Sequence, residues 1–463
     1  MRISPKMEMH KIIKTIRNSK WCLWEGNTLT SIPDWLYFSV ALILSLYASC
    51  FMITDSIGTI AQRIVVTLGF VVWIFCAKHL RKGPISWLLI AAILVPLISW
   101  GAAHLTHPQW AESSPKVHRL TSWFMFIPVL IWLGGREKNV LILWSVALCG
   151  VAVSPWISGG GWEEILNGFA GQRVDFKLHN AQHAGMLFAI ALLGVISFSR
   201  RFMLKHGEVS WIGVGLWSFF IVFFSSGVLV TQSRGVWIGL IFALIIMALI
   251  TVYLSRRRKF KILTFKTILC FVLLGFVGFT LISYTSTSDI ILKRLSYENE
   301  YMLKVAGVID GDDVVVSQST GARVTTWLEC IKWAKERPFI GWGGNGRRIV
   351  IQNSVDLPQQ MKSYGHFHSS YLDILIMFGV LGLAIYLLLL LSFISNVWLN
   401  FLKEQLSLDF FLFFIAFLSF WIVVNVFESY MFFSSGTYVF SLIVGGGMTL
   451  FLRDNCKMRE SHS

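Results

Sequence analysis

The sequence predicts an all-α polytopic membrane protein with about twelve transmembrane helices and one large outer loop that contains short helices. Of the 463 residues, 55% are hydrophobic and only 14% are charged, whereas soluble domains carry roughly 25% charged residues. Apolar runs of about 20 residues, each long enough to cross a bilayer as a helix, recur from Trp35 almost to the C-terminus. Basic residues cluster in alternate connections between these runs, as expected for a chain that crosses a membrane repeatedly.

The chain divides into a leader, two blocks of spans with a long loop between them, and a tail. Residues 1–34 are basic and partly amphipathic, and we interpret them as a cytoplasmic segment near anionic lipid. Spans one to nine occupy residues 35–284, the loop 285–367, spans ten to twelve 368–452, and a cytoplasmic tail 453–463. The individual spans are expected near 35–53, 60–78, 85–103, 121–135, 139–157, 181–199, 211–230, 235–254, 265–284, 368–394, 407–426 and 436–452.

The distribution of positive charge sets the orientation. Of the 40 Lys and Arg residues, 24 fall in segments that share one side in a twelve-span chain, six fall on the opposite side, and ten lie in the long loop. Short cytoplasmic loops are enriched in Lys and Arg, whereas long loops escape this rule. Both termini are therefore expected in the cytoplasm. The net charge of +15 is spread over short loops, which argues against a nucleic-acid-binding surface.

The loop 285–367 is expected to be extracytoplasmic and is too long to be a simple connector. It passes an acidic patch at Asp310, Asp312 and Asp313, which lacks the ligand spacing of a calcium loop. Ser319 or Thr320 can cap a helix that ends before Pro338. The glycine-rich segment 341–346 that follows can bring backbone N–H groups close to a ligand.

No metal or cofactor is expected. The seven cysteines form no C-x-x-C pair and most lie within apolar runs, so we interpret them as small core residues. A P-loop, a G-x-S-x-G elbow and an H-E-x-x-H motif are all absent from the sequence. Several outer-side histidines could together hold a metal, but no pair has convincing ligand spacing: His104, His107, His118, His366 and His368.

His368 is the candidate catalytic residue, because it stands where the tenth predicted span emerges into water. An ionisable residue at such a position is a functional-site candidate, and the ordinary pKa of histidine suits proton transfer near neutrality. The alternative is an interfacial histidine that caps the helix.

Three arginines from separate parts of the chain map to the same outer side as His368: Arg173, Arg234 and Arg323. Each alone could be a solvated charge, or an arginine whose guanidinium reaches the headgroups. Together they favour a phosphate-bearing substrate, because a guanidinium grips phosphate with two parallel hydrogen bonds and stays charged at any working pH. Arginines plus a histidine at a membrane surface indicate a lipid-linked phosphate or pyrophosphate substrate with a proton to remove.

The chain resembles the O-antigen ligase family, which belongs to a superfamily that also includes O-antigen polymerases and protein O-oligosaccharyltransferases. The family motif is His, then Asn, Ser or Gln, nine residues, Gly, two residues, and Gly, Thr or Tyr. It is matched in full by His368-Ser369, Gly379 and Gly382. The Ser-Arg-Gly at 233–235 and the segment from Arg323 to Gly343 are also similar to the family, over roughly 170–390.

The resemblance implies that His368 is the catalytic base and that Arg234 and Arg323 hold the donor diphosphate, with Arg173 carried over on a looser match. It implies an inverting, metal-independent transfer of O-antigen polysaccharide from undecaprenyl pyrophosphate to a sugar hydroxyl of lipid A–core oligosaccharide. The reaction would complete lipopolysaccharide at the periplasmic face of the bacterial inner membrane. Alternatives are an O-antigen polymerase, a protein O-oligosaccharyltransferase and, in another class, a lipid-linked glycan flippase or transporter.

Overall fold

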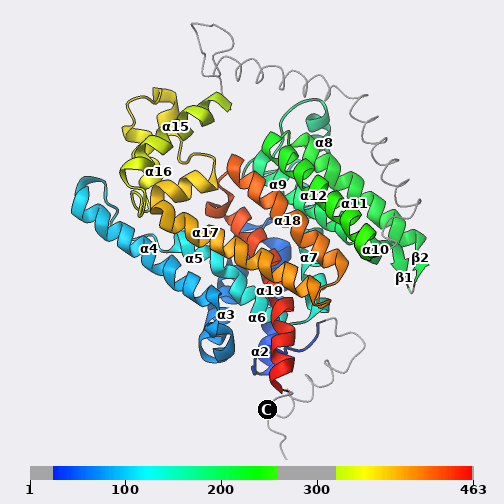
Figure 1. Cartoon of the computed structure of the whole chain (residues 1–463). Coiled ribbons are helices and arrows are strands. Elements are labelled where there is room, and N and C mark those ends of the chain that lie inside the picture. The colour runs from blue at the N-terminus through cyan, green and yellow to red at the C-terminus, as the bar shows by residue number, and fades with distance from the viewer. Residues whose placement is uncertain (1–23, 206, 259–319, 461–463) are drawn as a thin grey trace, which may run out of the picture.

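The computed structural model describes residues 24–205, 207–258 and 320–460, and most of them are helical. The long helices form one bundle in which the C-terminal end of α19 lies opposite the end that carries α8, α15 and α16 (Figure 1). The predicted ninth span (265–284), the acidic patch at Asp310, Asp312 and Asp313, and the leader before residue 24 lie outside the described residues.

Eight helices in the described part of the chain are long and apolar enough to cross a membrane. They are α3 (Asp55–Phe75), α4 (Pro84–Thr106), α7 (Glu137–Ile157), α11 (Trp211–Val230), α12 (Arg234–Arg258), α17 (Ser370–Leu402), α18 (Leu408–Phe427) and α19 (Ser434–Glu460). The predicted all-α membrane fold is confirmed to this extent, and the protein is a multi-pass membrane protein.

Three further apolar stretches are shorter than 18 residues: Asp34–Cys50, His118–Leu133 and Ala181–Ser197. They coincide with predicted spans one, four and six, and they form α2 (Asp34–Cys50), the series α5 (His118–Thr121), η3 (Ser122–Met125) and α6 (Phe126–Leu133), and α9 (Ala181–Ser197). The count of twelve spans, the sides on which the connections lie and the cytoplasmic position of the termini stay predictions.

Short elements connect the long helices. They are η1 (Lys78–Lys82), η2 (Pro108–Trp110), α8 (Trp162–Phe169), α10 (Ser199–Met203), the hairpin strands β1 (Leu204–Lys205) and β2 (Glu208–Val209), α15 (Thr320–Glu336), α16 (Gly346–Asn353), η4 (Gln359–Ser363) and η5 (Tyr430–Phe432). The helix expected to end before Pro338 is α15, so this part of the sequence interpretation is confirmed.

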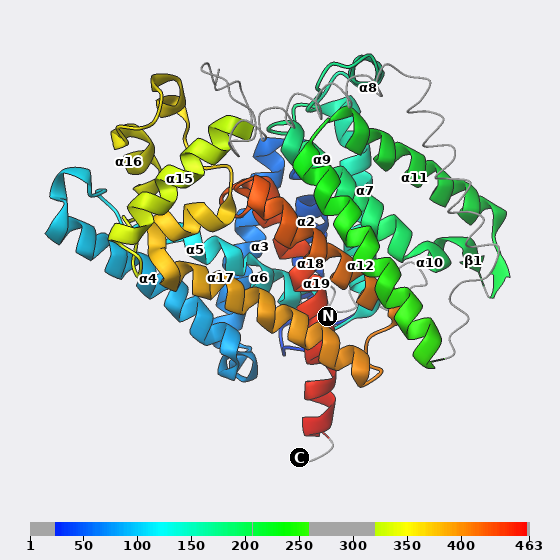
Figure 2. The same ribbon diagram turned by 45° about the horizontal axis from the view of Figure 1, so that its top comes forward.

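Helices α18 and α19 form the buried centre, as Figure 2 shows from a second direction. Helix α12 approaches α18 closely because it presents glycines there: a Cβ on Gly235 would stand 2.7 Å from Cβ of Phe427, and one on Gly239 would stand 2.7 Å from Cγ1 of Val424. The beginning of α12 therefore lies beside the end of α18.

The first motif glycine, Gly379, breaks helix α17. Its φ of 61° and ψ of −160° are not helical, and only glycine adopts such a conformation without strain. A Cβ there would stand 2.3 Å from the carbonyl carbon of Phe339. The chain at 338–340 occupies the break, and its carbonyls at Pro338 and Phe339 accept from the N–H groups of Val380 (2.7 Å) and Leu381 (3.2 Å).

The glycine-rich segment 341–346 extends this contact. Trp342 N–H donates to the carbonyl of Ile376 at 2.8 Å, and Gly343 N–H donates to that of Met377 at 3.0 Å. Gly341 has a φ of 65°, and a Cβ there would stand 2.5 Å from the carbonyl carbon of Met377. The sequence suggested that N–H groups of this segment could approach a ligand. Those of Trp342 and Gly343 instead donate to carbonyls of α17 and hold the segment against this helix.

The predicted topology can be tested on exposed positions of the described chain. In a background without native cysteines, Val355→Cys in the predicted outer loop should react with a membrane-impermeant maleimide on intact spheroplasts. Val209→Cys, in the β1–β2 hairpin of a connection predicted to be cytoplasmic, should react only after permeabilisation. Val355 and Val209 are 93% and 57% exposed, so burial does not block labelling. The opposite pattern of labelling would overturn the orientation.

Candidate active site

The segment that carries His368 is held firmly in front of α17. The N–H of Phe367 donates to Oδ1 of Asp373 at 3.0 Å, and its carbonyl accepts from Nε1 of Trp327 on α15 at 2.8 Å. Asp373 is fully buried and its other oxygen accepts from Nη1 of Arg347 at 2.9 Å. Helices α15, α16 and α17 therefore fix the backbone on which His368 stands.

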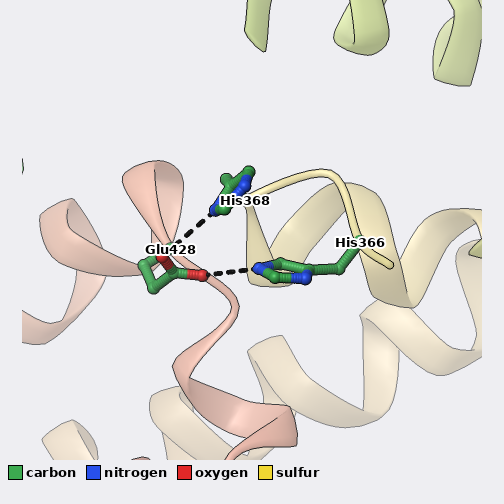
Figure 3. A group of neighbouring side chains, drawn as sticks. All are labelled: His366, His368 and Glu428. Carbon is green, nitrogen blue, oxygen red and sulfur yellow. Dashed lines mark hydrogen bonds and ion pairs between the residues drawn. The ribbon is translucent and has the colours of Figure 1, made fainter. Parts of the chain in front are cut away.

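His368 lies just before the helix and does not cap it. Ser369 occupies the N-cap position of α17, while His368 has a φ of 51°, a left-handed conformation that non-glycine residues adopt rarely. The side chain of His368 turns instead toward the end of α18 (Figure 3). The helix-cap alternative is therefore not the arrangement in the structure.

Glu428, the residue after α18, lies at the centre of the site. Its carboxylate contacts two histidines: Oε1 is 3.0 Å from Nε2 of His366, and Oε2 is 3.2 Å from Nδ1 of His368 (Figure 3). The side chain of Glu428 is 1% exposed, against 20% for His366 and 28% for His368. A buried acceptor thus faces two partly accessible imidazoles.

The carboxylate stays ionised at neutral pH. Burial alone raises the pKa of Glu428, but the hydrogen bonds and positive charge of His366 and His368 together hold that pKa well below its ordinary value. An ionised carboxylate only accepts hydrogen bonds, so the facing nitrogens Nε2 of His366 and Nδ1 of His368 carry protons. In neutral His368 this leaves Nε2 as the nitrogen that can accept a proton.

Arg323, on α15, reaches the same carboxylate through Gln182 at the start of α9. In the orientation of the Gln182 amide that satisfies both ends, its oxygen accepts from Nη2 of Arg323 at 2.5 Å and its nitrogen donates to Oε2 of Glu428. Burial lowers the pKa of Arg323 and the charge of Glu428 opposes this effect, but guanidinium remains charged at any working pH.

Arg173 and Arg234 lie around the same end of the bundle. Burial and the charge of Glu428 raise the pKa of the Tyr430 hydroxyl, whereas the charges of Arg323 and Arg173 both act to lower it. Arg234 is the first residue of α12, next to Gly235, which packs against Phe427. Segments from four separate parts of the chain therefore surround Glu428.

His366, His368 and Glu428 also have the side-chain types of a metal site. Among the described residues their ligand atoms form a group within 4.8 Å of one another, to which His104, His107 and His118 do not belong. Two imidazoles and one carboxylate suit Zn²⁺. In this structure the same nitrogen and oxygen atoms bond to one another.

Sequence reasoning found His368 and Arg323 but passed over Glu428 and Gln182. Glu428 directly follows an apolar run of 20 residues. An ionisable residue at the end of such a run is a functional-site candidate, so the sequence did contain a signal for Glu428. Gln182 carries no comparable signal, since an uncharged amide near a helix start is common, and only the tertiary contact with Arg323 and Glu428 distinguishes it.

The structure thus defines a multi-pass α-helical membrane protein with a histidine–carboxylate cluster and arginines at one end of its bundle. Residues 219–387 match the family model described as O-antigen ligase, which confirms the resemblance to that family. The match includes Arg234, Arg323 and His368, whereas Arg173, Gln182 and Glu428 lie outside it. A comparison with curated proteins finds no match. The family implies a glycosyltransferase-like enzyme that acts on lipid-linked glycans.

Glu428→Gln should disturb the orientation of the histidines while the protein still folds. Glutamine places an amide NH2 where one of the two carboxylate oxygens now accepts, so one imidazole N–H faces a donor and loses its acceptor. We therefore expect turnover to fall roughly 10²–10⁴-fold, the loss typical of a misoriented or missing base. Turnover per folded molecule of the purified variant is the measurement, and Glu163→Gln, an exposed change on α8, is the control. Unaltered turnover would contradict the assignment.

The same variant should change the pH dependence of stability. Because the pKa of Glu428 in the folded protein lies below the ordinary value of 4.5, the ionised carboxylate contributes stability fully above that pH. The contribution is lost as the pH falls through the lower folded-state pKa. The difference in unfolding temperature between wild type and Glu428→Gln should therefore be greatest above pH 4.5 and shrink in acid.

Proposed function

We propose that the protein is an O-antigen ligase that transfers an O-antigen polysaccharide from undecaprenyl pyrophosphate to a sugar hydroxyl of lipid A–core oligosaccharide. The reaction would take place at the periplasmic face of the bacterial inner membrane. The observation that carries the proposal is the pair of contacts around Glu428, which combines an oriented imidazole with a guanidinium one amide away. The match to the O-antigen ligase family over 219–387 supports it.

His368 is the proposed general base. With Nδ1–H held by Glu428, neutral His368 would take the proton of the acceptor hydroxyl on Nε2, and the imidazolium that forms would be stabilised by the carboxylate. The acceptor oxygen would bond to the anomeric carbon as the bond from that carbon to the phosphate oxygen breaks. A single displacement of this kind inverts the anomeric centre and needs no nucleophile on the protein.

The arginines are the proposed diphosphate-binding residues. Negative charge develops on the lipid pyrophosphate as it leaves, and fixed guanidinium groups in a partly desolvated site stabilise it. Arg323 is the best supported by position, because Gln182 joins it to the base cluster. Arg234 and Arg173 complete the proposed set, from the start of α12 and from the connection between α8 and α9.

One experiment separates the proposed activity from its alternatives. Purified protein is incubated with an undecaprenyl-pyrophosphate-linked glycan and lipid A–core, with and without EDTA. A ligase yields glycosylated lipid A–core, and EDTA leaves the yield unchanged. A polymerase lengthens the carrier-linked glycan, a protein O-oligosaccharyltransferase requires a protein acceptor, and a flippase transfers nothing. Inhibition by EDTA would show that a divalent cation is required, and His366, His368 and Glu428 would be the candidate ligands to substitute first.

His368→Ala tests the base directly. We expect a folded protein that still binds the carrier-linked donor, because the arginines remain, while turnover falls roughly 10²–10⁴-fold. Activity of the wild type should also fall on acidification, since a protonated imidazole cannot act as a base. Donor binding and turnover are measured on the same purified sample.

Two histidine variants serve as comparisons. His366→Ala should have a smaller effect than His368→Ala, because the family motif falls on His368. His104→Ala removes an exposed imidazole at the end of α4 and should leave turnover unchanged. Near wild-type turnover for His368→Ala would remove the residue from the mechanism.

Arg234→Lys and Arg323→Lys test the diphosphate grip. Lysine keeps the charge but lacks the planar fork that binds phosphate with two hydrogen bonds, so each variant should raise the donor KM and lower turnover while expression stays normal. Arg348→Lys, at an exposed position on α16, is the matched control. Full activity of both test variants would remove Arg234 and Arg323 from the proposed diphosphate site.

A further inference from the structure

Two opposite charges lie close together at the site without forming a direct ion pair in the described contacts. Arg323 and Glu428 each bond to the Gln182 amide, the guanidinium to its oxygen and the carboxylate to its nitrogen. The two charges also act on one another: burial lowers the pKa of Arg323, and the charge of Glu428 is the largest influence that opposes this effect. Gln182 therefore stands between an anion and a cation that attract each other.

We propose that Gln182 is a positioning residue that keeps Arg323 and Glu428 apart, so that the guanidinium stays available to the donor diphosphate and the carboxylate to the histidines. This inference rests on the proposed function and extends it to a residue outside the family match. A primary amide suits the task, because it offers an acceptor to guanidinium and a donor to carboxylate at once.

The backbone of Gln182 is fixed for this role. Its N–H donates to Oδ1 of Asn180, the N-cap of α9, at 2.8 Å. Its carbonyl accepts from the hydroxyl of Tyr430 at 3.0 Å, only two residues from Glu428. The amide is thus presented from a capped helix start, and it is tied to the same connection that carries the carboxylate.

Without the amide, the two charges should pair directly. Arginine and carboxylate form strong two-point hydrogen bonds, most strongly where water is largely excluded, and Glu428 is almost fully buried. Such a pair would use the Glu428 oxygens that now face His366 and His368, and it would turn the guanidinium of Arg323 away from a ligand. Donor binding and base orientation would then both suffer.

Gln182→Leu, of similar size but without the amide, is the test variant. Binding is measured with undecaprenyl pyrophosphate as the probe and undecaprenol as the blank. We expect the dissociation constant to rise about tenfold or more, the loss of one charge-assisted contact, and turnover to fall as well. Gln109→Leu, an exposed glutamine in η2, is the control and should bind like wild type.

A second substitution distinguishes spacing from general damage. If Arg323 is captured by Glu428 in Gln182→Leu, then Gln182→Leu with Glu428→Gln should bind the probe nearly as tightly as wild type, while its turnover stays low. Failure of this rescue, or wild-type binding by Gln182→Leu alone, would overturn the proposal. A structural defect would weaken binding in both variants alike.

The role of Gln182 can also be tested without a substrate, so that the test remains valid if the protein is not an O-antigen ligase. Arg323→Gln and Glu428→Gln are combined in a double-mutant cycle on the unfolding temperature, once in the wild-type background and once in the Gln182→Leu background. The coupling between the two substitutions should be weaker in the first background, where the amide separates the charges, than in the second, where they pair directly. Equal coupling in both backgrounds would refute the proposal that Gln182 keeps the two charges apart, whatever the substrate is. If wild type does not bind the probe, only the proposal of a diphosphate ligand is refuted.

Discussion

The end of the bundle that carries the site depends on one buried carboxylate. Glu428 stands where α18 ends, and each of its oxygens accepts from a histidine of the segment that precedes α17. Ser370, in the first turn of α17, adds a hydrogen bond of 2.6 Å to Asn425 near the end of α18. An uncompensated carboxylate in such a place would be strongly unfavourable. Its hydrogen-bond partners are therefore part of the fold as well as of the site.

The break in α17 serves this arrangement from the other side. Gly379 lets the chain at 338–340 enter the helix, and Gly341 brings the next residues against its carbonyls. Helix α15 is thereby anchored on α17, so that Trp327 can hold Phe367 and Arg323 can reach Gln182. The two glycines of the motifs thus act on the site at a distance, through the backbone that carries its charged residues.

Charged and neutral side chains have different roles in the site. Glu428 fixes the tautomer of His368, Arg323 presents positive charge, and the Gln182 amide lies between the two charged groups. In the proposed mechanism a base takes a proton close to a cation that binds the leaving phosphate. The carboxylate that orients the base therefore lies near the guanidinium, and these two opposite charges attract each other. The proposed role of the Gln182 amide, which has both a donor and an acceptor, is to keep these two charges apart.

The sequence by itself determined the membrane class and the positions of most helices, and it predicted His368 and Arg323 as candidate site residues. Apolar length and a continuous motif are local properties. The eight helices of membrane-spanning length among residues 24–205, 207–258 and 320–460 and the family match at 219–387 agree with them. Only the tertiary structure shows that Oε2 of Glu428 lies 3.2 Å from Nδ1 of His368, although the two residues are 60 positions apart in the sequence. It also shows that the Gln182 amide joins Glu428 to Arg323. Hydrogen bonds between distant segments follow from helix packing and leave no periodic or compositional trace, which is why these partners had to be found in three dimensions.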